Sequence, residues 1–221
     1  MLNMFTERVH QMRLPRSPVS PSRAELRQAT QERVLTAADS LFRERGFDAT
    51  TIRDIADASG VSVGSVMASG DKNALLVQVF DSLIEKGHAQ PPTVVGRGDS
   101  CADGILNLVR PFVALFTSRQ DLSRMYASIQ VSGKEPSPLF TRLAALLVDE
   151  ISATITEHGC TDPAAIAGTA QAIYFAYIGT LFSRSAQQTI DEPELLASLH
   201  VTFTSICACT SGAHTSQEFA P

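Results

Sequence analysis

The sequence has few cysteines, and their spacing matches neither a disulfide framework nor a metal site. The four cysteines of the 221-residue chain are Cys101, Cys160, Cys207 and Cys209, and no two of them form a CxxC pair. Cys207 and Cys209 would point to nearly opposite sides of a helix. We therefore expect reduced thiols, in a chain long enough to fold around a hydrophobic core without disulfides.

Motifs of metal sites and catalysis are also absent. The histidines are His10, His88, His158, His200 and His214, and no two of them stand four residues apart. No HExxH, GxSxG, P-loop or complete GxGxxG motif occurs. We expect no metal, no cofactor and no catalytic residues, and hence a protein that is not an enzyme.

Long apolar segments are scarce as well. Charged side chains interrupt the first fourteen residues, which argues against a secretory signal and favours a cytoplasmic protein. Residues 163–183 carry no charge and are long enough to span a bilayer. Their alanine, glycine, threonine and glutamine content is only mildly apolar, which favours the centre of a helical bundle over a membrane partner.

Positive charge is concentrated near the N-terminus, although the net charge is −5. Residues 1–46 contain eight arginines and five acidic residues, whereas seven basic and twelve acidic residues follow from position 88 onward. A nucleic-acid-binding surface is therefore expected in the N-terminal part.

Every periodic segment has helical spacing, so the sequence predicts an all-α fold. Capping residues place the first four helices at 23–45, from Ile52 to about 59, between Ser62 and Ser69, and from Asp71 to about 86. Five further helices are expected at 101–118, 120–132, 138–158, 163–187 and 192–209.

The two short helices have the spacing of a helix-turn-helix. Ala56 supplies a small residue where the helices cross, Gly60 a glycine in the turn, and Val66 a branched residue that fixes the second helix. A helix two turns long is unstable alone, but its neighbours can hold it so that its N-terminal end reads the major groove.

Residues 34–76 resemble the N-terminal domain of TetR-type (TetR/AcrR) transcriptional repressors. The shared motifs are the AA..LF..RGF run at 37–47, TTI..IA at 50–56, GVS.GS at 60–65, and Lys72 with Leu75 and Leu76. In that family three N-terminal helices bind DNA, the C-terminal helices enclose a small ligand, and the last two helices form a dimer. The resemblance implies a homodimeric, ligand-responsive repressor that binds double-stranded DNA at a palindromic operator.

Two departures from the family pattern fall at the end of the second short helix. Met67 stands where family members usually have a tyrosine that donates to a phosphate, and methionine cannot donate. The chain is also one residue short before Gly70 and lacks the phenylalanine that packs under the fourth helix. The alternative hypothesis is therefore a ligand- or partner-binding helical dimer that has lost specific operator recognition.

Candidate DNA-binding residues lie on the outward side of the helix-turn-helix. Thr51 and Ser62 are helix caps that can also contact phosphate, while valine and serine side chains can meet base edges. The candidates are Thr51, Arg53, Ser62, Val63, Ser65, Met67 and Lys72.

Candidate ligand and dimer residues lie in the C-terminal helices. A bundle pocket is lined by aromatic residues with a few polar groups, and no placed charge favours a charged ligand, so a small apolar ligand is expected. The pocket candidates are Phe112, Phe116, Met125, Tyr126, Gln130, Gln171, Tyr174 and Phe175. A small-residue face and an apolar stripe suggest a four-helix dimer interface. Its candidates are Gly168, Ala172, Ala176 and Gly179, with Leu195, Leu199, Phe203 and Ile206.

The predicted domain order follows from these elements. It comprises a flexible basic arm at 1–22, a helix-turn-helix DNA-binding domain at 23–87, a linker at 88–99, a ligand-binding and dimerisation domain at 100–210, and a flexible tail at 211–221. Arginines of the arm are candidates for an adjacent minor groove.

Overall fold

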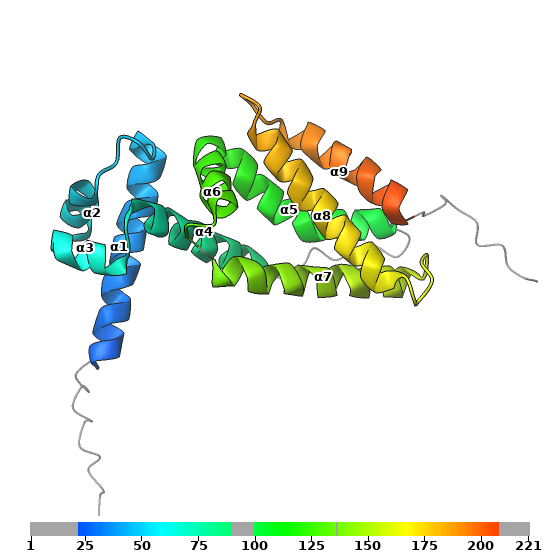
Figure 1. The fold of residues 1–221 in the computed structure, drawn as a ribbon, viewed down its shortest axis with the longest axis horizontal. Helices are drawn as coiled ribbons and strands as arrows, with labels where there is room; N and C mark the ends of the chain where they lie inside the picture. The colour runs from blue at the N-terminus through cyan, green and yellow to red at the C-terminus, as the bar shows by residue number, and fades with distance from the viewer. Residues whose placement is uncertain (1–21, 90–99, 136, 208–221) are drawn as a thin grey trace, which may run out of the picture.

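The computed structural model of the protein describes residues 22–89, 100–135 and 137–207, which form nine helices and no strands (Figure 1). The all-α prediction is confirmed. The helices are α1 (Arg23–Arg45), α2 (Ile52–Ser59), α3 (Val63–Ser69), α4 (Lys72–His88), α5 (Cys101–Ser118), α6 (Gln120–Ser132), α7 (Pro138–His158), α8 (Ile166–Ser185) and α9 (Glu192–Cys207). Residues 1–21 of the predicted arm, most of the predicted linker, and the predicted tail lie outside the described residues.

The N-terminal helices begin at the predicted caps. Ser22 forms a capping box with Glu25, and Thr51 forms one with Asp54, so each cap satisfies otherwise unpaired amides at the start of its helix. The Ser62 side chain accepts from the Ser65 amide at the start of α3. These local hydrogen bonds fix where the short helices begin.

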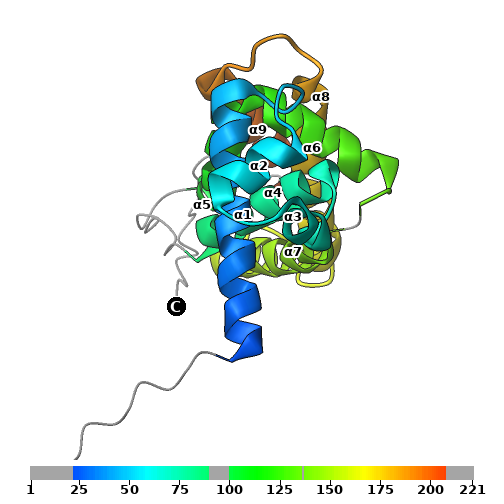
Figure 2. The same ribbon diagram turned by 90° about the vertical axis from the view of Figure 1, so that its left-hand side faces the viewer.

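Helices α1 to α3 form one end of the molecule, and α4 leads from them into the remaining helices (Figures 1 and 2). The interior of this end consists of Val34, Ala38, Phe42, Ile55 and Val66, each at most 1% exposed. Tertiary burial of this kind stabilises α2 and α3, which are too short to be stable in isolation.

Helix α5 is central to the C-terminal helices, where it packs against α7 and α9, while α8 packs against both α7 and α9. Gly104 allows the close approach of α5 to α7, since a Cβ there would lie 2.8 Å from the Thr154 methyl carbon. No helix among the described residues is apolar and long enough to cross a bilayer.

The structure corrects the predicted boundaries of α8. Residues 163–165 form a turn, because Asp162 accepts from two amides: its carboxylate from that of Ala164 and its carbonyl from that of Ala165, each at 2.8 Å. The helix therefore begins at Ile166 and ends at Ser185 instead of spanning 163–187.

Candidate DNA-binding surface and ligand cavity

The α2–turn–α3 unit has the geometry that its residue spacing predicted. Gly60 ends α2 in the left-handed region with φ 66°, where glycine carries no Cβ penalty. The next amide, from Val61, donates back to the Ala56 carbonyl at 3.2 Å. Ala56 is 2% exposed and Val66 fully buried, so the turn and the core contact together fix the angle between α2 and α3.

The outward side of α3 carries small or flexible side chains. Val63 is 43% exposed and Met67 is 52% exposed, while Val66 faces the interior. The hydroxyls of Ser62 and Ser65 lie 2.9 Å apart. This surface offers methyl groups and hydroxyls to a groove, but no guanidinium or amide that could form a bidentate contact with a base.

The other three DNA-binding candidates differ in the interactions that their side chains make within the chain. Thr51 donates to the Asp54 carboxylate at 2.6 Å, and this hydrogen bond lowers the pKa of Asp54. Arg53 is exposed on α2. The Lys72 ammonium donates to the Phe47 carbonyl at 3.0 Å and lies 4.3 Å from the centroid of the Phe47 ring, so Lys72 ties α4 to the loop before α2.

The shortened connection after α3 depends on Gly70. This residue has φ 140°, and a Cβ there would lie 2.7 Å from the Ala74 Cβ of α4. Because the backbone approaches α4 so closely, the connection needs neither an additional residue nor an aromatic side chain beneath the helix. Glycine is the residue that tolerates both the positive φ and the close contact.

Helix α4 holds α1 and α3 through one side chain. The Gln78 amide nitrogen donates to the Ser69 carbonyl at the end of α3, at 2.8 Å, and its amide oxygen accepts from Gln31 of α1, also at 2.8 Å. A displacement of α4 would therefore act directly on the short helix that presents Val63 and Ser65.

The middle of α4 is anchored to the C-terminal helices by Asp81. The Ser137 hydroxyl, at the start of α7, lies 2.9 Å and 2.8 Å from its two carboxylate oxygens, and the Tyr126 hydroxyl of α6 lies 3.5 Å away. Burial raises the pKa of Asp81, although hydrogen bonds from Ser137 and Tyr126 oppose the increase. A second link joins Arg119, between α5 and α6, to Asp39 of α1 by an ion pair.

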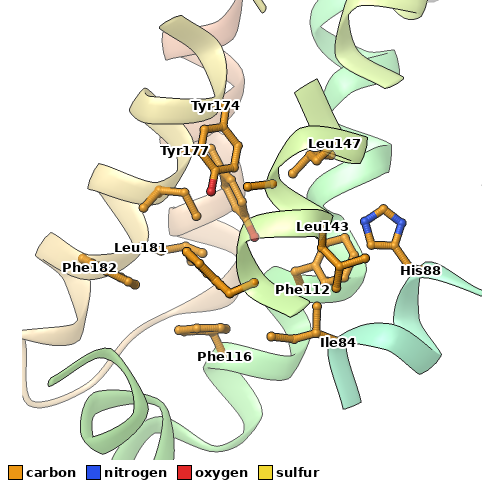
Figure 3. Close-up of a pocket in the computed structure, with 13 residues that line it drawn as sticks. Ile84, His88, Phe112, Phe116, Leu143, Leu147, Tyr174, Tyr177, Leu181 and Phe182 are labelled. Atoms are coloured by element: carbon orange, nitrogen blue, oxygen red, sulfur yellow. The ribbon is translucent and has the colours of Figure 1, made fainter. Parts of the chain in front are cut away.

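A cavity of about 480 Å³, including the space at its mouth, lies among α4, α5, α7 and α8 (Figure 3). The lining is dominated by aromatic and aliphatic side chains. It consists of Ile84, His88, Phe112, Phe116, Phe140, Leu143, Ala144, Leu147, Tyr174, Tyr177, Ile178, Leu181 and Phe182.

Three of the eight predicted pocket residues, Phe112, Phe116 and Tyr174, line this cavity. The other five predicted residues do not line this cavity; they are Met125, Tyr126, Gln130, Gln171 and Phe175. The first three belong to α6, which packs against α4 and α8 outside the cavity.

The remaining two candidates, Gln171 and Phe175, project from α8 away from the cavity, and Phe175 is 62% exposed. Sequence analysis missed the contribution of α7 and α4 because their lining residues are ordinary apolar side chains at core spacing. The aliphatic pattern of the sequence does not distinguish a cavity wall from a filled core.

The predicted dimer residues of α8 and α9 differ in their exposure. Gly168, Ala172 and Gly179 are exposed and Ala176 is half-buried, so α8 presents a small-residue surface. Leu195, Leu199 and Phe203 of α9 are at most 1% exposed and Ile206 is half-buried. Most of that α9 stripe is therefore covered within the chain, and only Ile206 of the four residues is partly accessible.

The exposed side of α9 carries Val201, which is 65% exposed, and Ala197. Helices α8 and α9 lie side by side in Figure 1 and are in contact. The exposed small and apolar residues of these two helices are Gly168, Ala172, Phe175 and Gly179 of α8 and Ala197 and Val201 of α9. We call this set the α8–α9 face.

Comparison with known proteins identifies the N-terminal part most specifically. Residues 34–79 match the model of a family described as bacterial regulatory proteins, tetR family. The matched segment contains α2, α3 and the first half of α4. No curated protein sequence matches the chain significantly.

Solved structures resemble nearly the whole described chain. A TetR transcriptional regulator from Rhodococcus sp. RHA1 has a TM-score of 0.61 at 17% identity, covering 81% of this chain and 95% of that one. Thermus thermophilus FadR, a TetR-family repressor in complex with lauroyl-CoA, has a TM-score of 0.58 at 21% identity, covering 83% and 97%. A TetR variant from Acinetobacter baumannii AYE in complex with minocycline has a TM-score of 0.53 at 17% identity, covering 79% and 92%.

At these identities the structures show the shared fold, whereas the family model identifies the helix-turn-helix domain. Both agree with the arrangement of a short α2–α3 unit attached through α4 to a helical bundle. Residues 34–79 therefore match the DNA-binding domain of the tetR family of bacterial regulatory proteins, and the described chain shares the fold of solved TetR-family regulators.

Proposed function

We propose that the protein is a ligand-responsive transcriptional repressor that acts as a homodimer on a palindromic operator. In this proposal residues 23–87 bind DNA, residues 88–99 connect the two functions, and residues 100–210 bind the ligand and dimerise. A two-fold dimer would present two α3 helices roughly 34 to 36 Å apart, about one turn of DNA.

The observation that carries the proposal is that α4 belongs to both parts of the molecule. Its first half is hydrogen-bonded to α1 and α3 through Gln78, and its second half lines the cavity with Ile84 and His88. Phe80, between them, lies 6.1 Å from Phe116 of the cavity wall, measured between ring centroids. A ligand that shifts α4 by its contacts in the cavity would thus change the position of α3.

The required coupling is modest. A coupling free energy of about 1 to 3 kcal/mol between ligand and DNA changes the affinity for DNA by 5- to 150-fold. The structurally related FadR and TetR proteins were crystallised with lauroyl-CoA and with minocycline, respectively, which supports small-molecule binding in this fold. For this chain we propose an apolar ligand in the cavity.

The proposed DNA contacts are those of the outward α2–α3 surface: Thr51, Arg53, Ser62, Val63, Ser65, Met67 and Lys72. A mobility-shift assay with the promoters of its own and neighbouring genes tests the proposal. We expect retardation of one promoter fragment at a salt concentration where an unrelated fragment of equal length is not retarded. Absence of retardation even at low salt would refute it.

The competing function, a ligand- or partner-binding dimer without operator recognition, is favoured by Met67. Its exposed side chain cannot donate to a phosphate. This function predicts only non-specific binding with a steep salt dependence. A genome-wide binding experiment separates the two functions, because a discrete footprint is expected only of the operator-binding repressor. Absence of any discrete footprint would support the alternative.

A gain-of-function variant tests the same point at one residue. Met67→Tyr restores the hydroxyl of the family pattern at an exposed position, so DNA affinity should increase about 2- to 10-fold, the net contribution of a typical hydrogen bond. The control is Met67→Phe, which adds the ring without the donor. Equal affinities of the two variants would show that no phosphate lies within reach of this position.

Dimerisation is proposed to use the α8–α9 face, since its apolar side chains have no cover within the described chain. Phe175→Arg or Val201→Arg should convert the dimer to a monomer in sedimentation analysis. Val131→Arg is the control, because Val131 is 74% exposed but belongs to α6. Dimerisation that survives both substitutions would mean that the interface lies elsewhere.

The N-terminal arm is proposed to add minor-groove contacts through Arg13 and Arg16, together with Arg23 at the start of α1. Deletion of residues 1–21 should reduce DNA affinity and flatten its salt dependence, because fewer counterions are released. An unchanged slope would leave the arm without a role in binding.

A further inference from the structure

The cavity wall carries a small set of polar atoms. Of its thirteen lining side chains, those of His88, Tyr174 and Tyr177 contain nitrogen or oxygen. No lysine, arginine or carboxylate is among the lining residues of the described chain. The polar atoms therefore determine which ligand chemistry the cavity can accept besides apolar surface.

Tyr177 is the most deeply buried of the three. Its side chain extends from α8 toward the middle of the cavity (Figure 3), and the residue is 3% exposed. Its hydroxyl makes no hydrogen bond with any residue in the described part of the chain, and burial raises its pKa. The donor of this hydroxyl is therefore available to a group bound in the cavity.

Tyr174 lies one turn earlier on the same side of α8 and also extends into the cavity (Figure 3). Burial raises its pKa as well. Both phenols therefore keep their protons at neutral pH, and each can donate one hydrogen bond but cannot pair with a cation as a phenolate.

The third polar group, His88, lies at the α4 side of the cavity. Its ring centroid is 5.1 Å from that of Phe112, and its Nδ1 is 3.8 Å from a carboxylate oxygen of Glu150. A carboxylate thus already lies beside the one imidazole among the lining side chains of the described chain. An anionic ligand would have to compete with Glu150 for the imidazole.

We propose that the cavity binds an uncharged, largely apolar ligand with a hydrogen-bond acceptor, such as a ketone or ester carbonyl, and that the Tyr177 hydroxyl donates to this acceptor. The proposal deepens the ligand response described above and rests on the same cavity. It concerns binding alone, however, so it can be tested without DNA.

The test compares two probes that differ in one group. Acetophenone and ethylbenzene have the same size and ring, but acetophenone has a carbonyl where ethylbenzene has a methylene. Calorimetric titration of the full-length protein gives the ratio of their dissociation constants. In Tyr177→Phe this ratio should shift against the ketone by roughly three- to tenfold, the contribution of one neutral hydrogen bond, while ethylbenzene affinity stays within about twofold.

Two further measurements make the test specific. Tyr174→Phe is the matched control, which removes a hydroxyl from the same helix and should shift the ratio less than Tyr177→Phe. Benzoate tests charge, and it should bind more weakly than acetophenone to the wild-type protein. A near-ultraviolet circular dichroism spectrum checks that each variant retains its tertiary packing.

The proposal is overturned if the ratio is unchanged in Tyr177→Phe, if benzoate binds more tightly than acetophenone, or if neither aromatic probe binds. Failure of the proposed repressor function gives a different result, namely loss of DNA retardation in a protein that still prefers the ketone. A protein that binds its operator but shows no Tyr177-dependent preference refutes this inference and leaves the DNA-binding function in place.

Discussion

Replacing Gly179 by alanine should have opposite effects on the folding of the single chain and on its assembly. Gly179 is an exposed residue in the interior of α8, and a Cβ built there has no atom within 4 Å. Alanine is favoured over glycine within a helix by about 0.8 to 1.0 kcal/mol. For a chain of this size, that gain corresponds to an increase in Tm of about 2 to 4 °C.

The dimer should respond in the other direction. If the α8–α9 face brings two helices close together, the added methyl groups force them apart, and overpacking costs about 1 kcal/mol or more per site. Two-fold symmetry places one methyl in each subunit, so a total of about 2 kcal/mol would raise the dimer dissociation constant about 30-fold.

Sedimentation equilibrium gives the dissociation constant, and thermal unfolding at a protein concentration where both proteins are monomeric gives the stability. Gly64→Ala is the control, because Gly64 is also exposed and helical but belongs to α3, where its Cβ would meet only the Ser62 hydroxyl oxygen, at 3.8 Å. A higher Tm with an unchanged dissociation constant would refute close helix contact at Gly179. A lower Tm in the monomer would refute the open surroundings seen in the structure.

Three further predictions test the packing of α4, α5, α7 and α9. Gly104→Ala should lower the free energy of unfolding by about 1 to 3 kcal/mol in denaturant titration, because the new Cβ would lie 2.8 Å from the Thr154 methyl carbon. A second substitution, Thr154→Ser, removes that methyl group and should recover much of the lost stability. Because burial raises the pKa of Asp81, the folded state holds one more proton than the unfolded state at pH values between the unfolded and folded pKa. The free energy of unfolding should therefore fall as pH rises through that window. Asp81→Asn should flatten this slope, and an unchanged slope would contradict the role given to Asp81. The sulfurs of Cys101 and Cys207 lie 3.4 Å apart, so diamide should oxidise them to a disulfide with loss of two hydrogens, which peptide mass spectrometry detects. Closing a loop of 106 residues should stabilise the fold by up to about 4.7 kcal/mol. Failure to cross-link would argue against this contact of α5 and α9.

The sequence was most informative where local chemistry determines the structure. The start of α1 was predicted correctly because Ser22 and Glu25 form a capping box whose partners are three residues apart. The helix-turn-helix was predicted because Gly60 and Val66 occupy positions with narrow steric requirements. In both cases, the interaction that fixes the element is contained within a few residues.

The cavity could be predicted only in part, because its wall comes from four helices far apart in the sequence. Phe112 and Phe116 were found through their aromatic side chains, but Leu143 and Leu147 have the same spacing as ordinary core residues. Phe175, by contrast, was predicted to line the cavity but does not. It is adjacent to Tyr174 in sequence, but a helical step of about 100° turns it out of the cavity and onto the α8–α9 face.

The burial of the predicted α9 stripe within the chain agrees with a general constraint on chains that assemble after folding. Leu195, Leu199 and Phe203 form the more apolar of the two sides of α9, and the structure uses them to cover α5 within the chain. If that side were left for a partner, each newly folded chain would expose a large aliphatic patch, and such patches promote aggregation. A weaker surface of alanine, glycine and single large residues such as Phe175 and Val201 would expose less apolar area in the separate chain and would still allow two helices to approach closely. In the proposed dimer, the stronger apolar stripe of α9 therefore belongs to the core of its own chain and the opposite side of α9 forms the interface, where Val201→Arg tests it.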